Sequence, residues 1–256
     1  MNTPESKPLT LPLSVKATMA LRLFAIQGVW TYETMIGNGI AFAMEPALRR
    51  LPGGPTGERY RTAMVRNSGY FNAHPYLAAV AVGALARAEL EGLPEAQIDR
   101  FRTAAPGPLG SVGDRLIWAG WLPLCSALGL LAFGLGATPA GVVMIFLGVY
   151  NVGHIALRIW ALHAGWRDGL RVAHALGNPV LRQGPAHVAR ATALVAGIAL
   201  PVAAQGIIGP GRALLGGVLA AVAVGALVVT ALHGKYEGWR LAIFALAAFV
   251  LFSVVR

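Results

Sequence analysis

The sequence is poor in charge and almost without cysteine. Only 12% of its 256 residues are charged, whereas 56% are hydrophobic, and its mean hydropathy is +0.60. Because a soluble domain carries about 25% charged residues, this composition excludes an ordinary soluble domain and predicts a protein embedded in a membrane. The single cysteine, Cys125, lies within an apolar stretch, so no disulfide can form within the chain.

The sequence also lacks the spacings that are typical of metal and nucleophile sites. It has no Cys-x-x-Cys pair and no Cys/His metal spacing, and no second ligand stands at helical spacing from His74. Ser111 has no histidine and aspartate arranged to activate it, and the glycines around it are not followed by Gly-Lys-Ser/Thr. We therefore expect no metal, no cofactor and no serine nucleophile.

Basic residues outnumber acidic ones, which gives a net charge of +10. Such a charge is compatible with nucleic-acid binding, but the arginines are scattered on the flanks of apolar segments. That pattern is typical of loops at an anionic membrane face, and we expect no nucleic-acid partner. Residues 1–13 are polar and rich in proline, which predicts a disordered tail without a cleavable signal peptide.

Residues 14–115 alternate short apolar and polar stretches that are too short or too interrupted for confident membrane spans. We expect interfacial or re-entrant helices here. The expected segments are two short helices within Val15–Arg50, a break at Leu51–Thr56, a charged helix at Glu58–Asn67, an apolar helix within Gly69–Arg87 and a polar helix at Glu89–Arg102.

Residues 116–256 contain apolar blocks close to the length of about 20 residues that crosses a bilayer. The blocks are Leu116–Gly136, Ala140–Leu162, Val188–Ile208, Ala213–Leu232 and Leu241–Val255, with a polar connector between Leu162 and Val188. The predicted fold is an all-α integral membrane protein, a multi-helix bundle with about five transmembrane segments after residue 115. Residues 14–256 would form a single membrane domain.

The segment Pro106–Asp114 contains three glycines and two prolines in nine residues. This composition predicts irregular backbone shaped by Gly107, Gly110 and Gly113. Because irregular backbone at membrane depth needs protein or water around it, the segment is a candidate substrate pathway. Its terminal Asp114 has three open interpretations: a sugar ligand, a cap for a helix beginning at Leu116, or an ion-pair partner of the next residue, Arg115.

Four other polar residues in the first half are candidates for a site. Asn72 and His74 precede Pro75, which suits a first helical position, so Asn72 is either a cap or a pathway residue and His74 either a buried structural histidine or a sugar ligand. Glu33 has no nearby base in the sequence, which favours a pathway or inter-subunit role. Glu45 lies beside Arg49 and Arg50 and is expected to form a surface ion pair.

The second long apolar block carries a polar stripe. Asn151, His154 and Arg158 stand at i, i+3 and i+7 and so share one helix face. Such a stripe in a membrane helix argues for a surface that faces protein or water rather than lipid. We expect these residues to face a partner subunit.

Four segments, in order, resemble one known family. They are Tyr32–Gly39, Tyr70–Pro75, Gly107–Asp114, and Leu157–Trp160 running into Gly165–Gly169. Together they resemble the IID component of the mannose/fructose/sorbose family of the bacterial phosphotransferase system, and the most specific parts are Phe-Asn-x-His-Pro and Gly-Pro-Leu-x-x-x-Gly-Asp. The resemblance covers roughly residues 23–200.

The resemblance implies a multi-pass subunit of the bacterial cytoplasmic membrane that forms a sugar channel with a IIC subunit, as higher oligomers of IIC–IID pairs. The implied partners are the IIA and IIB phosphocarriers and a hexose, and the chain itself would be neither phosphorylated nor catalytic. The implied pathway residues are Asn72, His74, Gly113, Asp114 and Glu33. Arg115, and Trp121 in place of an expected threonine, depart from the family and favour a non-transporting scaffold for the carriers as the alternative.

Overall fold

The computed structural model describes residues 10–171, 177–208 and residue 224, and these residues form helices and turns without a β-strand. Only isolated bridges pair Met35 with Thr31 and with Phe71. The α-helices are α1 Leu13–Arg22, α2 Gly37–Leu48, α3 Glu58–Ser68, α4 Ala78–Glu91, α5 Glu95–Ala104, α6 Pro106–Gly113, α7 Leu122–Gly134, α8 Pro139–Asp168 and α10 Pro179–Ile208. The short elements are the 3₁₀ turns η1 Leu23–Ala25 and η2 Gly54–Thr56 and the π-helix η3 Asp114–Trp121.

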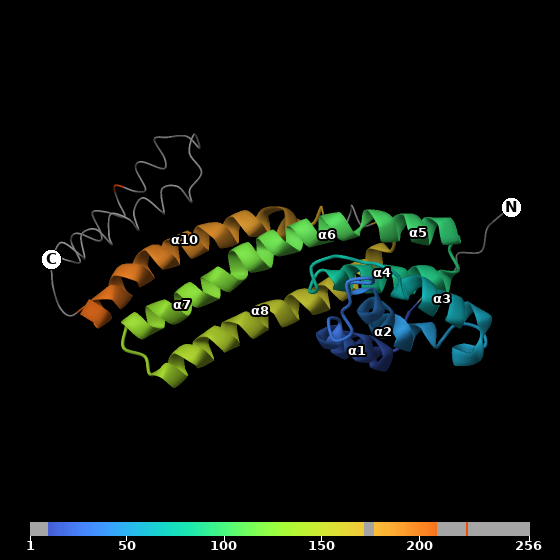
Figure 1. Cartoon of the computed structure of the whole chain (residues 1–256), viewed down its shortest axis with the longest axis horizontal. Helices are drawn as coiled ribbons and strands as arrows, with labels where there is room; N and C mark the ends of the chain where they lie inside the picture. The colour runs from blue at the N-terminus through green and yellow to red at the C-terminus, as the bar shows by residue number, and fades with distance from the viewer. Residues whose placement is uncertain (1–9, 172–176, 209–223, 225–256) are drawn as a thin grey trace. The chain divides into compact units, whose positions relative to one another are not determined.

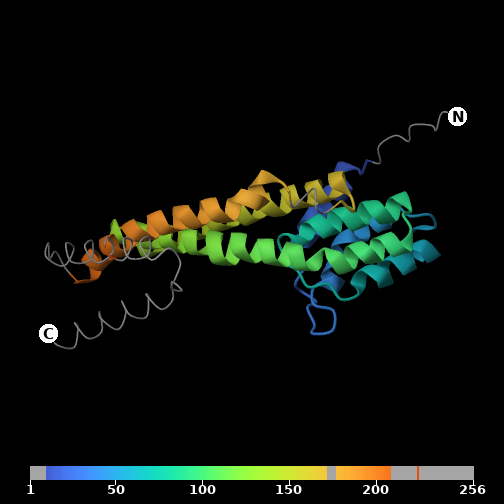
Figure 2. The same ribbon diagram turned by 90° about the horizontal axis from the view of Figure 1, so that it is seen from above.

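Short helices gather around α2 in the first half of the chain. Figure 1 shows α1, α2, α3 and α4 in one group, and Figure 2 shows the same group from above. Helix α2 packs against α1, α3 and α4, and its Ile40, Met44 and Leu48 are fully buried. The two helical pieces, the break and the charged helix expected before residue 68 are therefore confirmed. The apolar helix begins at Ala78, later than Pro75, and no side chain caps it.

The prediction of irregular backbone at Pro106–Asp114 is wrong. Residues 106–113 form α6, and Asp114 continues in right-handed helical geometry into η3. Pro106 is accommodated because it occupies the first turn, where a backbone N–H has no helical acceptor. The glycines remain helical because α6 is held by packing, with Leu109 fully buried. Gly110 and Gly113 allow the chain at Ala73 and His74 to approach the helix closely, whereas a β-carbon at Gly107 would meet no atom within 4 Å.

Three long apolar helical stretches have the length and composition to cross a membrane: Glu95–Gly134, Pro139–Asp168 and Pro179–Ala204. They overlap the first three predicted spans, but the first stretch begins about three turns before the glycine-rich segment and not at Leu116. The connector predicted between Leu162 and Val188 is shorter, because α8 and α10 extend into it. The predicted blocks at 213–232 and 241–255 lie outside the described residues.

The chain divides into two compact units, whose boundaries fall inside α7, α8 and α10. The first unit contains residues 1–126 and 144–193, and the second contains residues 127–143 and 194–256. In the second unit, α7 packs on α10 where Gly134 abuts Val202 and Ala203. The site described below lies within the first unit.

The expected ion pair between Glu45 and Arg49 forms, but the Glu45 side chain is buried and not at the surface. Its carboxylate accepts hydrogen bonds from Arg49, from Arg22 Nη1 at 2.7 Å and from the Tyr60 hydroxyl at 3.1 Å, whereas Arg50 does not appear among these partners. Burial alone would raise the pKa of Glu45, but the hydrogen bonds from Arg49, Tyr60 and Arg22 outweigh it and lower the pKa. The carboxylate therefore ties α1 and α3 to α2.

A second buried polar network joins α3, α4 and α5. Glu89 accepts bonds from Asn67 Nδ2 at 2.8 Å and from Arg66 Nη1 at 3.1 Å. Arg102 donates to both oxygens of Asn67 at 3.2 Å and to the Gly69 carbonyl at 2.9 Å. Among the described residues, Arg66 Nε is the one buried side-chain nitrogen of this network without a hydrogen-bond partner. Because the other buried groups are paired, the network positions the chain that leads to Phe71 at low desolvation cost.

Glycines set the close crossing of α4 and α8. A β-carbon at Gly83 would overlap the Leu162 carbonyl and the Trp166 amide, and one at Gly165 would overlap the Val80 carbonyl. Small residues of this kind let helix backbones approach closely in membrane proteins. Arg87 secures the same crossing by donating to the carbonyl of Arg167 at 2.6 Å.

We predict that Gly165→Ala lowers the unfolding temperature of the detergent-solubilised chain, because the added methyl group forces α4 and α8 apart at a cost of about 1–3 kcal/mol. Gly148→Ala on the same helix is the matched control, since no atom lies within 4 Å of a β-carbon there. The control should be neutral or stabilising by up to about 1 kcal/mol. Equal unfolding temperatures for the two variants would contradict the close crossing.

Candidate functional site

Two separate sequence segments meet at His74 and Gly113. His74 lies in the turn that precedes α4, and Gly113 is the last residue of α6. A β-carbon at Gly113 would overlap the His74 ring, and one at Gly110, a turn earlier, would lie 3.8 Å from Ala73 Cα. Gly110 and Gly113 thus form the surface on which Ala73 and His74 rest. This contact brings together the two motifs that sequence analysis singled out.

His74 is buried, and its tautomer follows from its contacts. The side chain is only 2% exposed, and Nδ1 accepts a hydrogen bond from the Tyr76 amide at 3.2 Å. A neutral imidazole therefore carries its proton on Nε2, and this N–H has no acceptor among the described residues. Burial, and after it the positive charge of Arg158, lower the pKa of His74 to about 4, so the ring is neutral at pH 7.

Aromatic rings surround His74. The ring of Tyr76 lies edge-on at 4.9 Å and that of Trp118, on η3, at 5.1 Å. The Tyr76 hydroxyl is 2.7 Å from the hydroxyl of Tyr150 on α8. Tyr76, Trp118 and Tyr150 were not singled out from the sequence, because single aromatics in apolar stretches are common and carry no spacing signal.

The polar stripe of α8 lies on the other side of Tyr76. His154 stacks on the Tyr76 ring at 5.0 Å, and its Nε2 is 2.9 Å from Asn151 Oδ1. The Arg158 guanidinium lies 4.3 Å from the Tyr76 ring centre and 5.2 Å from that of Phe24. His154 Nδ1 and Arg158 Nε, like His74 Nε2, are buried and have no hydrogen-bond partner within the described residues.

The stripe is not the exposed, partner-facing surface that we expected. His154 is 7% exposed and Arg158 6%, and only Asn151 is half-buried. Arg158 donates to the Leu23 carbonyl of η1, so its cation is held by a carbonyl and two aromatic faces of the same chain. The prediction that the helix face avoids lipid is consistent with this burial, but its contacts are internal.

The remaining candidates are exposed and lie outside this buried cluster. Asn72 is exposed and does not cap α4. Asp114 is exposed in the middle of a helical stretch, so the cap interpretation is wrong, and no ion pair with Arg115 forms. Arg115 Nε instead donates to the Ser111 carbonyl at 3.3 Å. Glu33 is exposed in the loop between α1 and α2.

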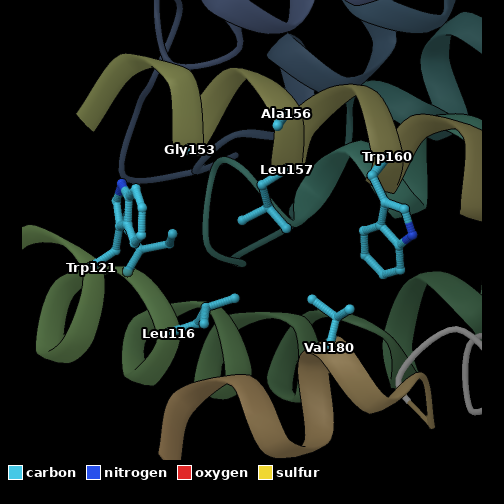
Figure 3. Close-up of a pocket in the computed structure, with 8 residues that line it drawn as sticks. Leu116, Trp121, Gly153, Ala156, Leu157, Trp160 and Val180 are labelled. Atoms are coloured by element: carbon cyan, nitrogen blue, oxygen red, sulfur yellow. The ribbon is translucent and has the colours of Figure 1, made fainter. Parts of the chain in front are cut away.

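Trp121 packs against α8. A β-carbon at Gly153 would overlap its indole, and Nε1 lies 3.4 Å from the Tyr150 carbonyl. The indole borders an apolar pocket of about 300 Å³, and Figure 3 shows Trp121 and Trp160 at opposite ends of that pocket. Leu116, Leu157 and Val180 line the space between them, which is therefore unsuited to a sugar.

The described residues contain no group of three histidine, cysteine or acidic side chains placed to hold a metal ion. The buried cluster instead offers neutral imidazole, one guanidinium and three aromatic rings. These are groups that hydrogen-bond and stack with an uncharged polar ligand. No side chain in the cluster is arranged as a nucleophile with a general base.

The described residues are helical and define a multi-pass membrane protein with a buried histidine–aromatic cluster between its first half and α8. Residues 13–184 match the family "PTS system mannose/fructose/sorbose family IID component". The chain belongs to this family. The match begins earlier and ends earlier than the span of resemblance seen in the sequence.

Several relatives and solved structures agree with this assignment. The mannose-specific EIID component of Escherichia coli K12 is 29% identical over 64% of this chain and 58% of its own length. The fructose permease IID component of Bacillus subtilis is 28% identical over 64% of this chain and 60% of its own length. The matched part of the chain thus spans less than two thirds of these relatives.

The fold also matches solved structures. A chain in the complex of mannose transporter ManYZ with microcin E492 superposes with a TM-score of 0.58 at 26% identity, over 73% of this chain and 69% of that one. A structure described as a membrane protein gives a TM-score of 0.64 at 26% identity, over 74% of this chain and 70% of that one. These two matches therefore support a helical membrane-protein fold for this chain.

A graded series on α6 tests the contact with His74. Gly113→Ala should lower the unfolding temperature, by about 1–3 kcal/mol in free energy, because the buried ring has no room to move. Gly110→Ala should have a small effect and Gly107→Ala none, since a β-carbon has ordinary contacts at the first position and nothing within 4 Å at the second. Thermal unfolding in detergent measures the order, and a Gly107 variant as damaging as the Gly113 variant would disprove it.

The lowered pKa of His74 predicts acid sensitivity. Between pH 6.5, the ordinary value, and about 4, the unfolded chain binds a proton that the folded chain does not. Stability is therefore full above pH 6.5 and decreases as the pH falls, by roughly 2–3 kcal/mol for this group. His74→Asn keeps an acceptor for the Tyr76 amide but cannot titrate. Unfolding temperatures at pH 7 and 4.5 should differ less in this variant than in the wild type, and an unchanged difference would refute the assignment.

Proposed function

We propose that the chain is the IID membrane subunit of a mannose-class phosphotransferase permease, which forms a sugar translocation channel with a IIC subunit. The observation that carries this proposal is the contact between His74 and Gly113, which joins the two most specific family motifs in one place. Relatives named as mannose-specific, sorbose-specific and fructose components support a hexose as substrate. The match to a chain in a complex of the mannose transporter ManYZ supports pairing with a second membrane protein.

The cluster around His74 suits a sugar. Hexoses present hydroxyl groups that donate and accept hydrogen bonds and C–H faces that stack on aromatic rings. His74 supplies a buried N–H without an acceptor, and Trp118 beside it supplies an exposed aromatic ring. An unpaired buried donor costs about 1–3 kcal/mol, a cost that a passing hydroxyl would offset. We place His74, Gly113 and the exposed Asn72 and Asp114 along the pathway, and the exposed Glu33 either along it or at the contact with the partner subunit.

The chain itself has a binding role and no catalytic one in this proposal. Phosphate would pass through the IIA and IIB carriers to the incoming sugar, and the IIC–IID pairs would assemble into higher oligomers in the bacterial cytoplasmic membrane. Residues 14–115 would lie at the interface or re-enter the membrane, and residues 116–256 would contain the transmembrane helices. In this proposal residues 14–256 would belong to one membrane domain behind the tail 1–13.

The non-transporting scaffold is the weaker candidate. It rests on Arg115 and Trp121, which depart from the family pattern. Trp121 packs on Gly153 of α8, and Arg115 bonds the Ser111 carbonyl of its own helix. The indole that lies on His74 is Trp118. Neither departure therefore places a bulky group on the His74 ring.

Sugar uptake tests the proposal. The chain is co-expressed with its IIC, IIA and IIB partners in a bacterium that lacks its own mannose permease, and uptake of labelled mannose, fructose and sorbose is measured. We expect uptake of at least one of these sugars by the wild type. Asp114→Asn should reduce it about tenfold or more if the carboxylate binds a hydroxyl group, whereas Asp99→Asn, which changes an exposed carboxylate on α5, should not.

The amount of IIC–IID complex, measured by co-purification, is the control for each variant. A wild-type complex that is stable but takes up none of the three sugars contradicts transport and favours the scaffold. Uptake by the chain without a IIC partner would contradict the shared channel. Loss of complex in the Asp114 variant would assign that residue to assembly rather than to the pathway.

A further inference from the structure

The loop between α1 and α2 presents large aromatic side chains to its surroundings. Residues 27–33 are seven consecutive exposed residues, and we call residues 27–36 the aromatic loop. Within it Tyr32 is 84% exposed and Trp30 44%, and their rings pack edge-to-face at 4.7 Å. Figure 2 shows this blue loop standing clear of the short helices. Such a pair would normally be buried, since each ring carries a large apolar area.

The aromatic loop is held rigidly in this position. The Thr31 hydroxyl accepts from the Thr34 amide at 3.1 Å and lies 2.8 Å from the Thr34 hydroxyl, and the Met35 amide donates to the Thr31 carbonyl at 2.8 Å. Asn38 Nδ2 donates to the Thr34 hydroxyl at 3.1 Å. Met35 adopts a left-handed φ of 51°, a conformation that a side chain other than glycine adopts only when its surroundings impose it.

The aromatic loop is also fastened to the site. The Phe71 amide donates to the Thr34 carbonyl, and the Ile36 amide donates to the Phe71 carbonyl, both at 3.1 Å. Phe71 is fully buried and opens the segment that leads to His74. The position of the exposed rings is thus fixed relative to the His74–Gly113 contact, and ordering them costs a partner little entropy.

The charge of the aromatic loop distinguishes a protein partner from a lipid surface. Residues 27–36 contain one acidic residue, Glu33, and no lysine or arginine, in a chain whose net charge is +10. Glu33 is exposed and has no ion pair among the described residues. Loops that bind an anionic membrane surface carry basic residues. A carboxylate beside two aromatic rings matches an arginine or lysine instead, through an ion pair and a cation–π contact.

We propose that the aromatic loop is a docking surface for the IIC subunit, on which a basic side chain of that subunit binds between Glu33 and the Trp30–Tyr32 pair. The inference rests on the proposed function for the identity of the partner. Trp and Tyr are the residue types that most often dominate binding energy at protein interfaces. The loop therefore couples partner binding to the segment that positions His74.

Photocrosslinking identifies what touches the aromatic loop. Tyr32 is replaced by p-benzoylphenylalanine in the full chain co-expressed with a tagged IIC subunit, and the exposed Val65 of α3 is replaced likewise as a matched control. We expect a crosslink to the IIC subunit from position 32 and none from position 65. A product with lipid alone, or with another part of the same chain, would overturn the inference.

Co-purification measures the energetic weight of the surface. The Trp30→Ala/Tyr32→Ala double variant should retain at least about tenfold less IIC subunit than the wild type, and Glu33→Gln about threefold less. Val65→Ala and Glu58→Gln, which change exposed residues of α3, should retain wild-type amounts. The unfolding temperature of each variant chain alone confirms that it is folded.

These outcomes separate the inference from the proposed function. If the wild type binds the IIC subunit and the double variant binds it equally well, the docking surface is wrong whether or not sugar is transported. If the variant loses the IIC subunit while the wild-type pair fails to take up sugar, the docking surface stands and the transport function is wrong. If the wild-type chain binds no IIC subunit, the IIC subunit is the wrong partner, and both the docking surface and the proposed function are contradicted.

Discussion

Close approach of backbone at glycine is the constraint on which the rest of this structure depends. Helices α4 and α8 cross where Gly83 lies against the backbone of α8 and Gly165 lies against the backbone of α4. The turn before α4 packs on Gly113 through His74. In α2, a β-carbon at Gly37 would overlap the Gly69 carbonyl and one at Gly39 the Ile26 carbonyl. Because apolar side chains gain little by leaving lipid for protein, such contacts supply much of the packing in a membrane protein.

Polar side chains inside this packing divide into two kinds. The Glu89–Asn67–Arg102 network has its hydrogen-bond partners within α3, α4 and α5, and it serves as internal support. The His74–His154–Arg158 cluster keeps three buried nitrogen atoms without partners in the described chain. Fully satisfied networks rigidify a fold, whereas unsatisfied groups are tolerated where they serve a function. Of the four buried side-chain nitrogen atoms without a hydrogen-bond partner in the described residues, three lie in this cluster and one, Arg66 Nε, lies in the first network. This concentration points to the His74 cluster as the functional part of the interior.

The sequence predicted the helical class, the short helices before residue 68 and the first three long apolar segments, because these depend on local hydrophobic pattern. The prediction failed at Pro106–Asp114, where the composition indicated a loop. These residues form a helix instead, because packing against Ala73 and His74 requires small residues there. It also failed for Glu45 and Arg158, whose partners lie far away in the chain. Contacts at long sequence separation, such as Tyr76 with Tyr150, leave no periodic signal in one sequence.

The π-helix η3 bears on how this chain is compared with others. A π-helical turn holds one residue more than an α-helical turn, so an inserted residue rotates every later position by about 100° relative to an uninterrupted α-helix. An alignment without gaps across residues 114–121 therefore pairs side chains that point in different directions. Spatial superposition rather than counting is the proper basis for equating residues beyond Asp114.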